Sequence, residues 1–369
     1  MIIMAPPYGM GALIRLTCVG IWLARCLDKI PVIWWGTSCL YSRDQRINYY
    51  EIFFKAPAGA TGEPYNVPLA AGAGSVYPDY WQAITPLSLQ AIDEHVPPND
   101  HYPHLEWKNS DSARIRNAEV CVLHSHLGFR EAWALAGRNM TEFDAATFDD
   151  LLGPIFREFF APGDAVLAAA KVSLADLLAA SNYKIGLHYR SSDKVAESTV
   201  PSVKRHALTA LKLGKDRPLL DFFVATDSAP GLAELRRRLG PHGRVMVQAI
   251  DRTSSLTPLH YLKASAFQNA IDMGVDVELL AQCAAFCGNS ESGVFWWVKH
   301  RRQALGVDGP LVHIEPGFED VLTSVVKFGK IFGARRAVGI APYRIREWAV
   351  GRLKQSGLLQ RNSRRALHR

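Results

Sequence analysis

An arginine follows an apolar run in residues 185–194, which read IGLHYRSSDK. The apolar part predicts a buried strand, and His188 and Arg190 stand where that strand passes into a polar loop. A guanidinium at the carboxyl end of a strand can donate two parallel hydrogen bonds to phosphate oxygens. Arg190 is therefore a candidate phosphate ligand, and an ordinary salt-bridged arginine is the alternative.

The same order of elements recurs in residues 221–240, DFFVATDSAPGLAELRRRLG. Residues 222–225 predict a short strand, and a helix is predicted from Pro230, since proline is tolerated in a first helical turn. The polar turn between them is formed by Thr226, Asp227 and Ser228. Its carboxylate and hydroxyl groups either contact a ligand or cap the helix.

A third instance lies in residues 275–302, where a helix-like segment leads into a short strand near 285–288. The following loop, 289–293, contains Ser290 and Ser292 and opens another helix, which is a natural anion-binding arrangement. Three strand–loop–helix units predict a doubly wound domain that binds its ligand at the carboxyl ends of parallel strands. The chemistry of these groups suits a nucleotide.

These segments together resemble a known family. HYRSSDKV, ATDS and the stretch from Asp276 to NSESG resemble the donor-binding domain of the α1,6-fucosyltransferases, above all the nodulation-type bacterial enzymes, and of the related protein O-fucosyltransferases. Residues 24–57 are similar to the N-terminal part of the same family. The resemblance implies a GT-B-like α/β fold with two Rossmann-like domains facing across a cleft. It also implies inverting, metal-independent transfer of fucose from GDP-fucose to a saccharide acceptor, without any further cofactor.

The resemblance also assigns roles. Arg190 would hold the diphosphate with support from His188, and Ser292 would donate to a diphosphate oxygen. Asp227 and Asp276 would contact the nucleoside. The full set of donor-binding positions is His188, Arg190, Asp193, Thr226, Asp227, Ser228, Asp276, Ser290 and Ser292. In transfer from a sugar nucleotide, negative charge builds on the departing diphosphate, so Arg190 and Lys194 are the expected catalytic cations.

The chain departs from the family pattern near its first motif. Ser191 stands where the α1,6 enzymes usually carry a second arginine, and Ser198 stands where they carry a glutamate. Glu197, one position earlier, is the candidate catalytic base, and a solvated loop carboxylate is the alternative. These departures leave open a different GDP-sugar as donor, or a catalytically silent relative that binds a nucleotide or a glycan.

No metal ligand set is expected. The nearest approach to an acidic diphosphate–metal motif is Asp276-Val277-Glu278, which is predicted to begin a helix with its two carboxylates facing different ways. Composition is that of a globular protein: 369 residues, 48% hydrophobic and 21% charged. Six cysteines without a Cys-x-x-Cys pair favour reduced thiols over disulfides or zinc.

The N-terminus is predicted to fold as a strand over residues 1–4, a helix over 12–28 and a strand over 31–35, rather than to act as a leader. We therefore expect a cytoplasmic enzyme. The predicted division is an N-terminal Rossmann-like, acceptor-side domain (1–178), a donor domain (179–326) and a basic tail (327–369). After the opening strand–helix–strand, the region up to residue 150 is expected to be rich in loops, with irregular structure at the Pro, Gly and aromatic clusters of residues 65–81 and 99–107. Aromatic residues that either stack on sugars or fill the core are Trp34, Trp35, Tyr49, Tyr50, Trp81 and Trp107.

Basic residues are concentrated at the end of the chain. Residues 327–369 carry a net charge of about +11, whereas the whole chain carries +7. Within this tail, residues 341–359 predict an amphipathic helix that includes Trp348 and Leu353. That helix suits an anionic membrane at its inner face; packing on the two domains and plain disorder are the alternatives. No motif for nucleic-acid recognition accompanies the charge.

Overall fold

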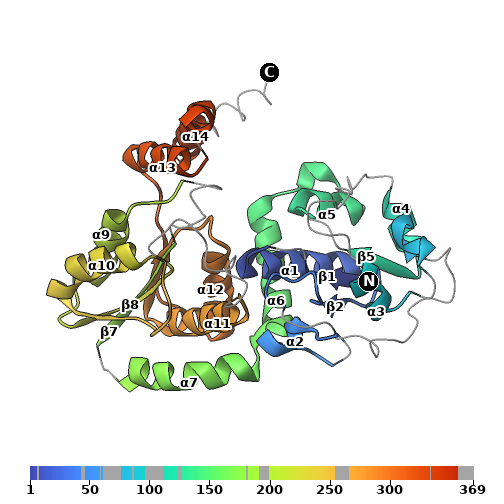
Figure 1. Ribbon diagram of the computed structural model, residues 1–369, viewed down its shortest axis with the longest axis horizontal. Helices are drawn as coiled ribbons and strands as arrows, with labels where there is room; N and C mark the ends of the chain where they lie inside the picture. The colour runs from blue at the N-terminus through green and yellow to red at the C-terminus, as the bar shows by residue number, and fades with distance from the viewer. Residues whose placement is uncertain are drawn as a thin grey trace. The chain divides into compact units, whose positions relative to one another are not determined.

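The computed structural model of the chain describes residues 1–5, 8–42, 46–58, 60, 76–84, 87–95, 111–123, 127–179, 182–190, 199–253, 266–332 and 334–355 (Figure 1). The chain divides into two compact units. The first unit contains Met1–Ala179, His260–Ala281 and Trp296–Val307, and the second contains Ala180–Leu259, Gln282–Phe295 and Asp308–Arg369. The domain boundaries predicted from the sequence, after residues 178 and 326, stay predictions.

A parallel sheet of order β2-β1-β5-β4 forms the centre of the first unit. Its strands are β1 (Ile2–Met4), β2 (Val32–Trp34), β4 (Val76–Tyr77) and β5 (Val120–Leu123). Ile3 pairs with Ile33 on one side and with Leu123 on the other. The helix α1 (Met10–Cys26) connects β1 to β2, so the predicted strand–helix–strand opening is confirmed within two residues at each end.

The middle of the first unit is more regular than expected. The sequence predicted a loop-rich region up to residue 150, with an irregular cluster over residues 65–81, yet β4 and β5 complete the parallel sheet there. Helices in the same region are α3 (Leu89–His95), α4 (Asp111–Asn117) and α5 (Phe129–Leu135). The strands are short, and in the sequence they are separated by segments rich in Pro, Gly and aromatic residues, so no periodic signal marks them.

An aromatic core fills the space beside this sheet. Trp35 contacts Tyr50 and Phe54 edge-to-face, with ring centroids 5.5 and 5.8 Å apart. Trp34, Trp35, Tyr49, Tyr50 and Trp81 are all at most 5% exposed. The interpretation of these five residues as core is confirmed, and a sugar-stacking role for them is wrong; Trp107 lies outside the described residues.

The remaining elements of the first unit surround that core. They are α2 (Tyr49–Phe53), the antiparallel pair β3 (Phe54–Lys55) and β6 (Ala161–Pro162), α6 (Ala145–Phe159) and α7 (Asp164–Ala179). Short 3₁₀ helices occur at Asp79–Ala83, Met140–Glu142 and, in the second unit, Gly240–His242. The two helices predicted over residues 147–161 and 164–180 are confirmed as α6 and α7.

The second unit is built on a five-stranded sheet of order β11-β10-β7-β8-β9, with every neighbouring pair parallel. Its strands are β7 (Tyr183–Tyr189), β8 (Leu220–Thr226), β9 (Arg244–Met246), β10 (Ala285–Gly288) and β11 (Leu311–His313). The helices α9 (Val203–Gly214) and α10 (Ala229–Leu239) pack side by side on the sheet (Figure 1). The strands predicted from all three sequence segments are confirmed.

Two further helices carry a buried ion pair. In α11 (Ala266–Gln282) Glu278 accepts two hydrogen bonds, of 2.7 and 2.8 Å, from the guanidinium of Arg301 in α12 (Gly293–Ala304). Both side chains are at most 14% exposed. The expectation that Asp276-Val277-Glu278 begins a helix is wrong, because α11 begins ten residues before Asp276.

The described part of the basic tail folds as two helices, α13 (Phe318–Phe332) and α14 (Ala334–Gln355). Trp348 of α14 packs on Phe318, with ring centroids 5.3 Å apart, and its indole N–H donates to the carbonyl of Pro316 at 3.3 Å. The helix predicted around Trp348 is thus confirmed. Within the described residues, every helix is too short or too polar to cross a bilayer.

Candidate functional site

The register of the second sheet aligns the ends of its strands. His188 pairs with Ala225 on one side and with Gly288 on the other, and Gly288 pairs in turn with His313. Because these strands are parallel, the residues that follow them emerge at one edge of the sheet (Figure 1). In open α/β sheets ligands bind outside the carboxyl ends of the strands. This edge is therefore the candidate site.

A cation and an anion stand next to each other at this edge. Nε of Arg190, directly after β7, lies 3.8 Å from Oδ2 of Asp227, directly after β8. Their side chains are 19% and 18% exposed, so both charged groups are partly withdrawn from water while still accessible. A guanidinium in this position can turn its donors toward a phosphate.

The turn after β8 is tightly organised. Ser228 Oγ accepts a hydrogen bond of 3.0 Å from the backbone N–H of Gly231, and the N–H of Ser228 donates to Thr226 Oγ1 at 3.2 Å. Ser228 is thus the N-cap of α10, and of the two capping candidates it is this hydroxyl that caps. A Cβ on Gly231 would lie 2.5 Å from Cε1 of Tyr189, so glycine lets the start of α10 pack on the end of β7.

The turn after β8 is also held by two backbone hydrogen bonds to Thr253. The N–H of Thr253 donates to the carbonyl of Asp227 at 2.9 Å, and the N–H of Ala229 donates to the carbonyl of Thr253 at 3.0 Å. These bonds fix the backbone of Asp227, so its carboxylate is held at the edge by the fold itself. Thr253 was not predicted from the sequence, because its contribution is made by backbone groups.

The loop after β10 presents hydroxyls. Asn289 Oδ1 accepts from the N–H of Glu291 at 3.0 Å, and Ser292 Oγ accepts from the N–H of Val294 at 3.3 Å. Ser292 is 4% exposed and stands at the start of α12, whereas Ser290 is exposed. A buried hydroxyl at a helix start has the position and the dipole to meet an anion.

A buried histidine supports the edge from beneath. His206 of α9 contacts the ring of Tyr189 edge-on, with centroids 5.0 Å apart, and its Nδ1 lies 3.0 Å from the carbonyl oxygen of Ser202. Burial lowers the pKa of His206 to about 4, against an ordinary value of 6.5. The ring is neutral at pH 7 and serves as packing, not as a cation for the ligand. Sequence reasoning did not single out this residue.

The structure therefore brings together most of the predicted positions. Those at the carboxyl edge of the second sheet are His188, Arg190, Thr226, Asp227, Ser228, Ser290 and Ser292. Asp276 is half-buried in the middle of α11, in a segment of the first unit. Asp193, Lys194 and Glu197, with Ser191 and Ser198, lie outside the described residues. Among the residues that are described, no three His, Cys, Asp or Glu side chains gather closely enough to hold a metal ion.

Comparison with known proteins identifies the fold. No family model matches the chain, and no curated protein matches it in sequence. A NodZ α-1,6-fucosyltransferase structure soaked with GDP-fucose matches with a TM-score of 0.53 and 16% identity, covering 81% of this chain and 91% of that one. The fucosyltransferase NodZ from Bradyrhizobium matches with a TM-score of 0.53 and 17% identity, covering 86% and 96%.

POFUT1 in complex with GDP-fucose also matches, with a TM-score of 0.51 and 13% identity over 86% of this chain and 98% of that one. The expected fold class is confirmed: two parallel α/β sheets of the kind found in GT-B proteins, in the arrangement of strands shared with solved fucosyltransferases. The resemblance stated from the sequence is thus confirmed at the level of fold.

Proposed function

We propose that the chain is an inverting, metal-independent glycosyltransferase that moves fucose from GDP-fucose to a saccharide acceptor. The observation that carries the proposal is the convergence of Arg190, Asp227 and Ser292 on one edge of the second sheet. A cation, a carboxylate and a buried hydroxyl at such an edge are the groups that a nucleoside diphosphate requires. The likeness in fold to structures holding GDP-fucose supports the choice of ligand.

In the proposed mechanism the sugar–phosphate bond lengthens, and negative charge builds on the departing diphosphate. Arg190, Lys194 and Ser292 stabilise that charge by donating hydrogen bonds to the diphosphate oxygens. Glu197 takes the proton from the acceptor hydroxyl as it attacks the anomeric carbon from the opposite face. Asp227 and Asp276 accept hydrogen bonds from the nucleoside, with Thr226, Ser228, Ser290, His188 and Asp193 completing the donor site.

Two alternatives follow from the departures in the first motif. With Ser191 in place of a second arginine, a different GDP-sugar could be the donor. With Glu197 one position from the family's glutamate, the chain could bind a nucleotide or glycan without turnover. The first alternative and a nucleotide-binding silent relative retain the nucleotide site, whereas a glycan-binding silent relative does not require it.

The experiment that separates these readings has two stages. Ligands that bind only the folded state raise the melting temperature, so thermal shifts are measured with GDP, GDP-fucose, GDP-mannose, UDP and UDP-GlcNAc. Release of GDP is then followed for every GDP-sugar that binds. Stabilisation by the guanine nucleotides together with turnover of GDP-fucose supports the proposal. Binding without turnover supports the silent relative. Equal melting-temperature shifts with UDP and GDP would refute a guanine-specific site.

We further propose that the α13–α14 pair touches an anionic membrane surface on the cytoplasmic side. Leu322 and Val326 are spaced four residues apart along α13 and are 47% and 60% exposed, so they continue as an exposed apolar stripe from Phe318, which packs on Trp348. Arg336 and Arg346 of α14 are exposed as well. An apolar stripe beside basic side chains is the composition of a helix that lies in a lipid interface.

Co-sedimentation with vesicles tests this contact. Binding to vesicles with anionic lipid, absent with neutral lipid and weakened by Leu322→Glu with Val326→Glu, would support it. The matched control is Leu219→Glu, which changes an exposed leucine just before β8. Equal binding by the doubly substituted protein would exclude the contact of the stripe, and binding that persists after deletion of residues 327–369 would exclude a part for the basic tail.

A further inference from the structure

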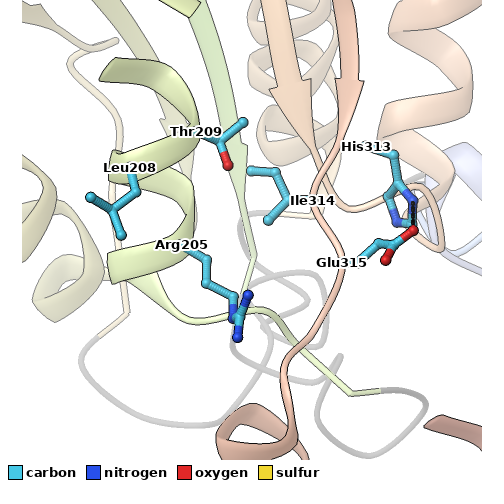
Figure 2. Close-up of a pocket in the computed structure, with 6 residues that line it drawn as sticks. All are labelled: Arg205, Leu208, Thr209, His313, Ile314 and Glu315. Atoms are coloured by element: carbon cyan, nitrogen blue, oxygen red, sulfur yellow. Dashed lines mark ion pairs between the residues drawn. The ribbon is translucent and has the colours of Figure 1, made fainter. Parts of the chain in front are cut away.

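A pocket of about 280 Å³ opens beside α9, on the side of β11 (Figure 2). One wall is α9, whose contributing residues are three and four positions apart and so share one helix face. The other wall is the backbone that leaves β11. The lining residues are Arg205, Leu208, Thr209, His313, Ile314 and Glu315. None of them belongs to the predicted donor site.

One rim of the pocket is held rigidly. Nε of Arg205 lies 2.8 Å from Oδ2 of Asp320, a carboxylate that is only 4% exposed. Asp320 also accepts from the backbone N–H groups of Ser202 at 3.0 Å and Gly317 at 2.7 Å. A Cβ on Gly317 would lie 1.8 Å from Nη2 of Arg205, so a larger residue at this position would displace the guanidinium. A rim fixed in this way loses little entropy when a ligand binds.

The charges of the pocket do not favour an anion. Asp320 compensates the guanidinium of Arg205, and Glu315 adds a carboxylate whose Oε1 lies 4.0 Å from Nδ1 of His313. Burial lowers the pKa of His313 below its ordinary value, with the carboxylates of Glu315 and Glu291 opposing that shift, so the ring is neutral at pH 7. The pocket thus offers donors and acceptors without an excess of positive charge.

The remaining surface is apolar. Ile314 is 3% exposed and lies between Thr209 and Glu315, whereas Leu208 is 55% exposed and lies on α9 to the left of the polar residues in Figure 2. Hydroxyl groups on a ligand can bond to the guanidinium, the Thr209 hydroxyl and the Glu315 carboxylate, while C–H groups lie on the aliphatic surface. A pyranose ring has this combination of a hydroxyl rim and apolar faces.

We propose that this pocket binds a neutral saccharide and serves as a subsite for the acceptor. The role as acceptor subsite rests on the proposed function, whereas saccharide binding rests on the pocket alone. The pocket lies at the carboxyl edge of the second sheet: His313 pairs with Gly288, and the N–H of Ile314 donates to the carbonyl of Gly288 at 2.8 Å. The loop with Ser290 and Ser292 leaves the same strand end. Donor and acceptor sites would thus share one edge.

Binding is tested on the whole protein without any nucleotide. The probes are chitotetraose, maltotetraose and cellotetraose, with inorganic phosphate as the anionic comparison, and affinities come from titration calorimetry. We expect at least one oligosaccharide to bind. Glu315→Gln and Leu208→Glu should each weaken it about tenfold or more, because a carboxylate acceptor or an apolar contact is lost. Leu219→Glu is the matched control and should leave binding unchanged, and melting shifts with GDP should be the same in all variants.

The outcomes separate the two proposals. Binding of no oligosaccharide, binding that both pocket variants leave intact, or displacement of the saccharide by phosphate would overturn the pocket assignment. If saccharide binds here but GDP-fucose is not turned over, the glycosyltransferase proposal fails and the saccharide site stands. If transfer occurs, the pocket variants should raise KM for the acceptor and leave kcat and KM for GDP-fucose unchanged. An unchanged acceptor KM would overturn the subsite role.

Discussion

Arg190 and Asp227 face each other across two neighbouring parallel strands, with 3.8 Å between Nε and Oδ2. Their opposition is a consequence of register, because Tyr189 pairs with Thr226 and each charged residue directly follows its strand. The carboxylate compensates the guanidinium, so this pair of charges is close to neutral before any ligand binds.

Replacing Arg190 by lysine should slow transfer without preventing folding. A lysine keeps the charge but loses the planar fork, so we expect a loss of about 2–4 kcal/mol in transition-state stabilisation, or roughly thirty- to a thousand-fold in rate. The measurement is kcat/KM for GDP-fucose. The matched control is Arg217→Lys. Arg217 precedes β8 and stacks on Tyr183, the first residue of β7. Near-normal turnover by Arg190→Lys would show that Arg190 has no part in catalysis.

Replacing Asp227 by asparagine should weaken GDP selectively. If its carboxylate accepts from the nucleoside, the amide removes the charge and presents donors to donors, costing about 1–3 kcal/mol or more. We expect the melting shift with GDP to shrink, while the melting temperature without ligand stays within a few degrees. UDP should give no shift with either protein. If Asp227→Asn shows the same melting-temperature shift with GDP as wild type, Asp227 does not contact the nucleoside.

Chelation should not affect activity. The two carboxylates nearest to a metal motif are Asp276 and Glu278, and Glu278 is already held by two hydrogen bonds from Arg301. We therefore expect the rate in excess EDTA to stay within about twofold of the untreated rate. Loss of activity that Mg²⁺ or Mn²⁺ restores would contradict a metal-independent mechanism.

Breaking the buried Glu278–Arg301 pair should destabilise the protein strongly. Glu278→Gln leaves a guanidinium that is only 14% exposed without its counter-ion, at an expected cost of about 3–5 kcal/mol in the free energy of unfolding. The comparison is Glu234→Gln in α10. Glu234 pairs with Arg237 and Arg238, which are partly exposed to water, so this variant should lose much less free energy of unfolding. Urea unfolding followed by circular dichroism measures both. Similar losses of unfolding free energy in the two variants would mean that burial does not determine how much each ion pair contributes to stability.

Stability should fall on acidification because of His206. Its pKa is about 4 in the folded chain, against an ordinary value of 6.5, so between these values the unfolded chain binds a proton that the folded chain does not. The contribution of neutral His206 to the free energy of unfolding is fully present above pH 6.5. It is lost as the pH falls toward 4, and this loss is on the order of 3 kcal/mol. His206→Phe removes it, so the difference in unfolding free energy between wild type and variant should narrow on acidification.

His300 provides the control for that measurement. Burial also lowers its pKa to about 4, and it is retained in the His206 variant. The variant should therefore keep part of the acid sensitivity. If the difference in unfolding free energy between wild type and His206→Phe stays constant from pH 7 to 4.5, His206 has the same pKa in the folded and the unfolded chain.

Local pattern predicted the strands that matter for the site. The apolar runs ending at Tyr189, Thr226 and Gly288 are bounded by polar turns, and each one forms a strand of the second sheet. The aromatic residues posed a different problem, because Trp35 and Tyr50 look alike in sequence whether they fill a core or stack on a sugar. Only the fold, which buries both completely, decides between these roles.

What the sequence could not predict depends on distant partners. The burial of Glu278 was not predicted, because no local pattern indicates the Arg301 guanidinium of α12 that pairs with it. The saccharide pocket joins Arg205 and Thr209 to His313 and Glu315, which no local motif connects. Thr253 braces the Asp227 turn through its backbone, so its side chain carries no signal. Interactions of this kind become visible only once the chain has folded.

All six cysteines are free thiols, and five of them are buried. Burial raises the pKa of Cys39 and Cys121 to about 12, and it also raises that of Cys18, Cys26 and Cys287. Only the thiolate reacts readily with alkylating reagents. A cysteine introduced at an exposed position such as Val172 would therefore take up a maleimide dye ahead of the native thiols. The chain can be labelled for fluorescence or spin-resonance measurements with its own cysteines left in place.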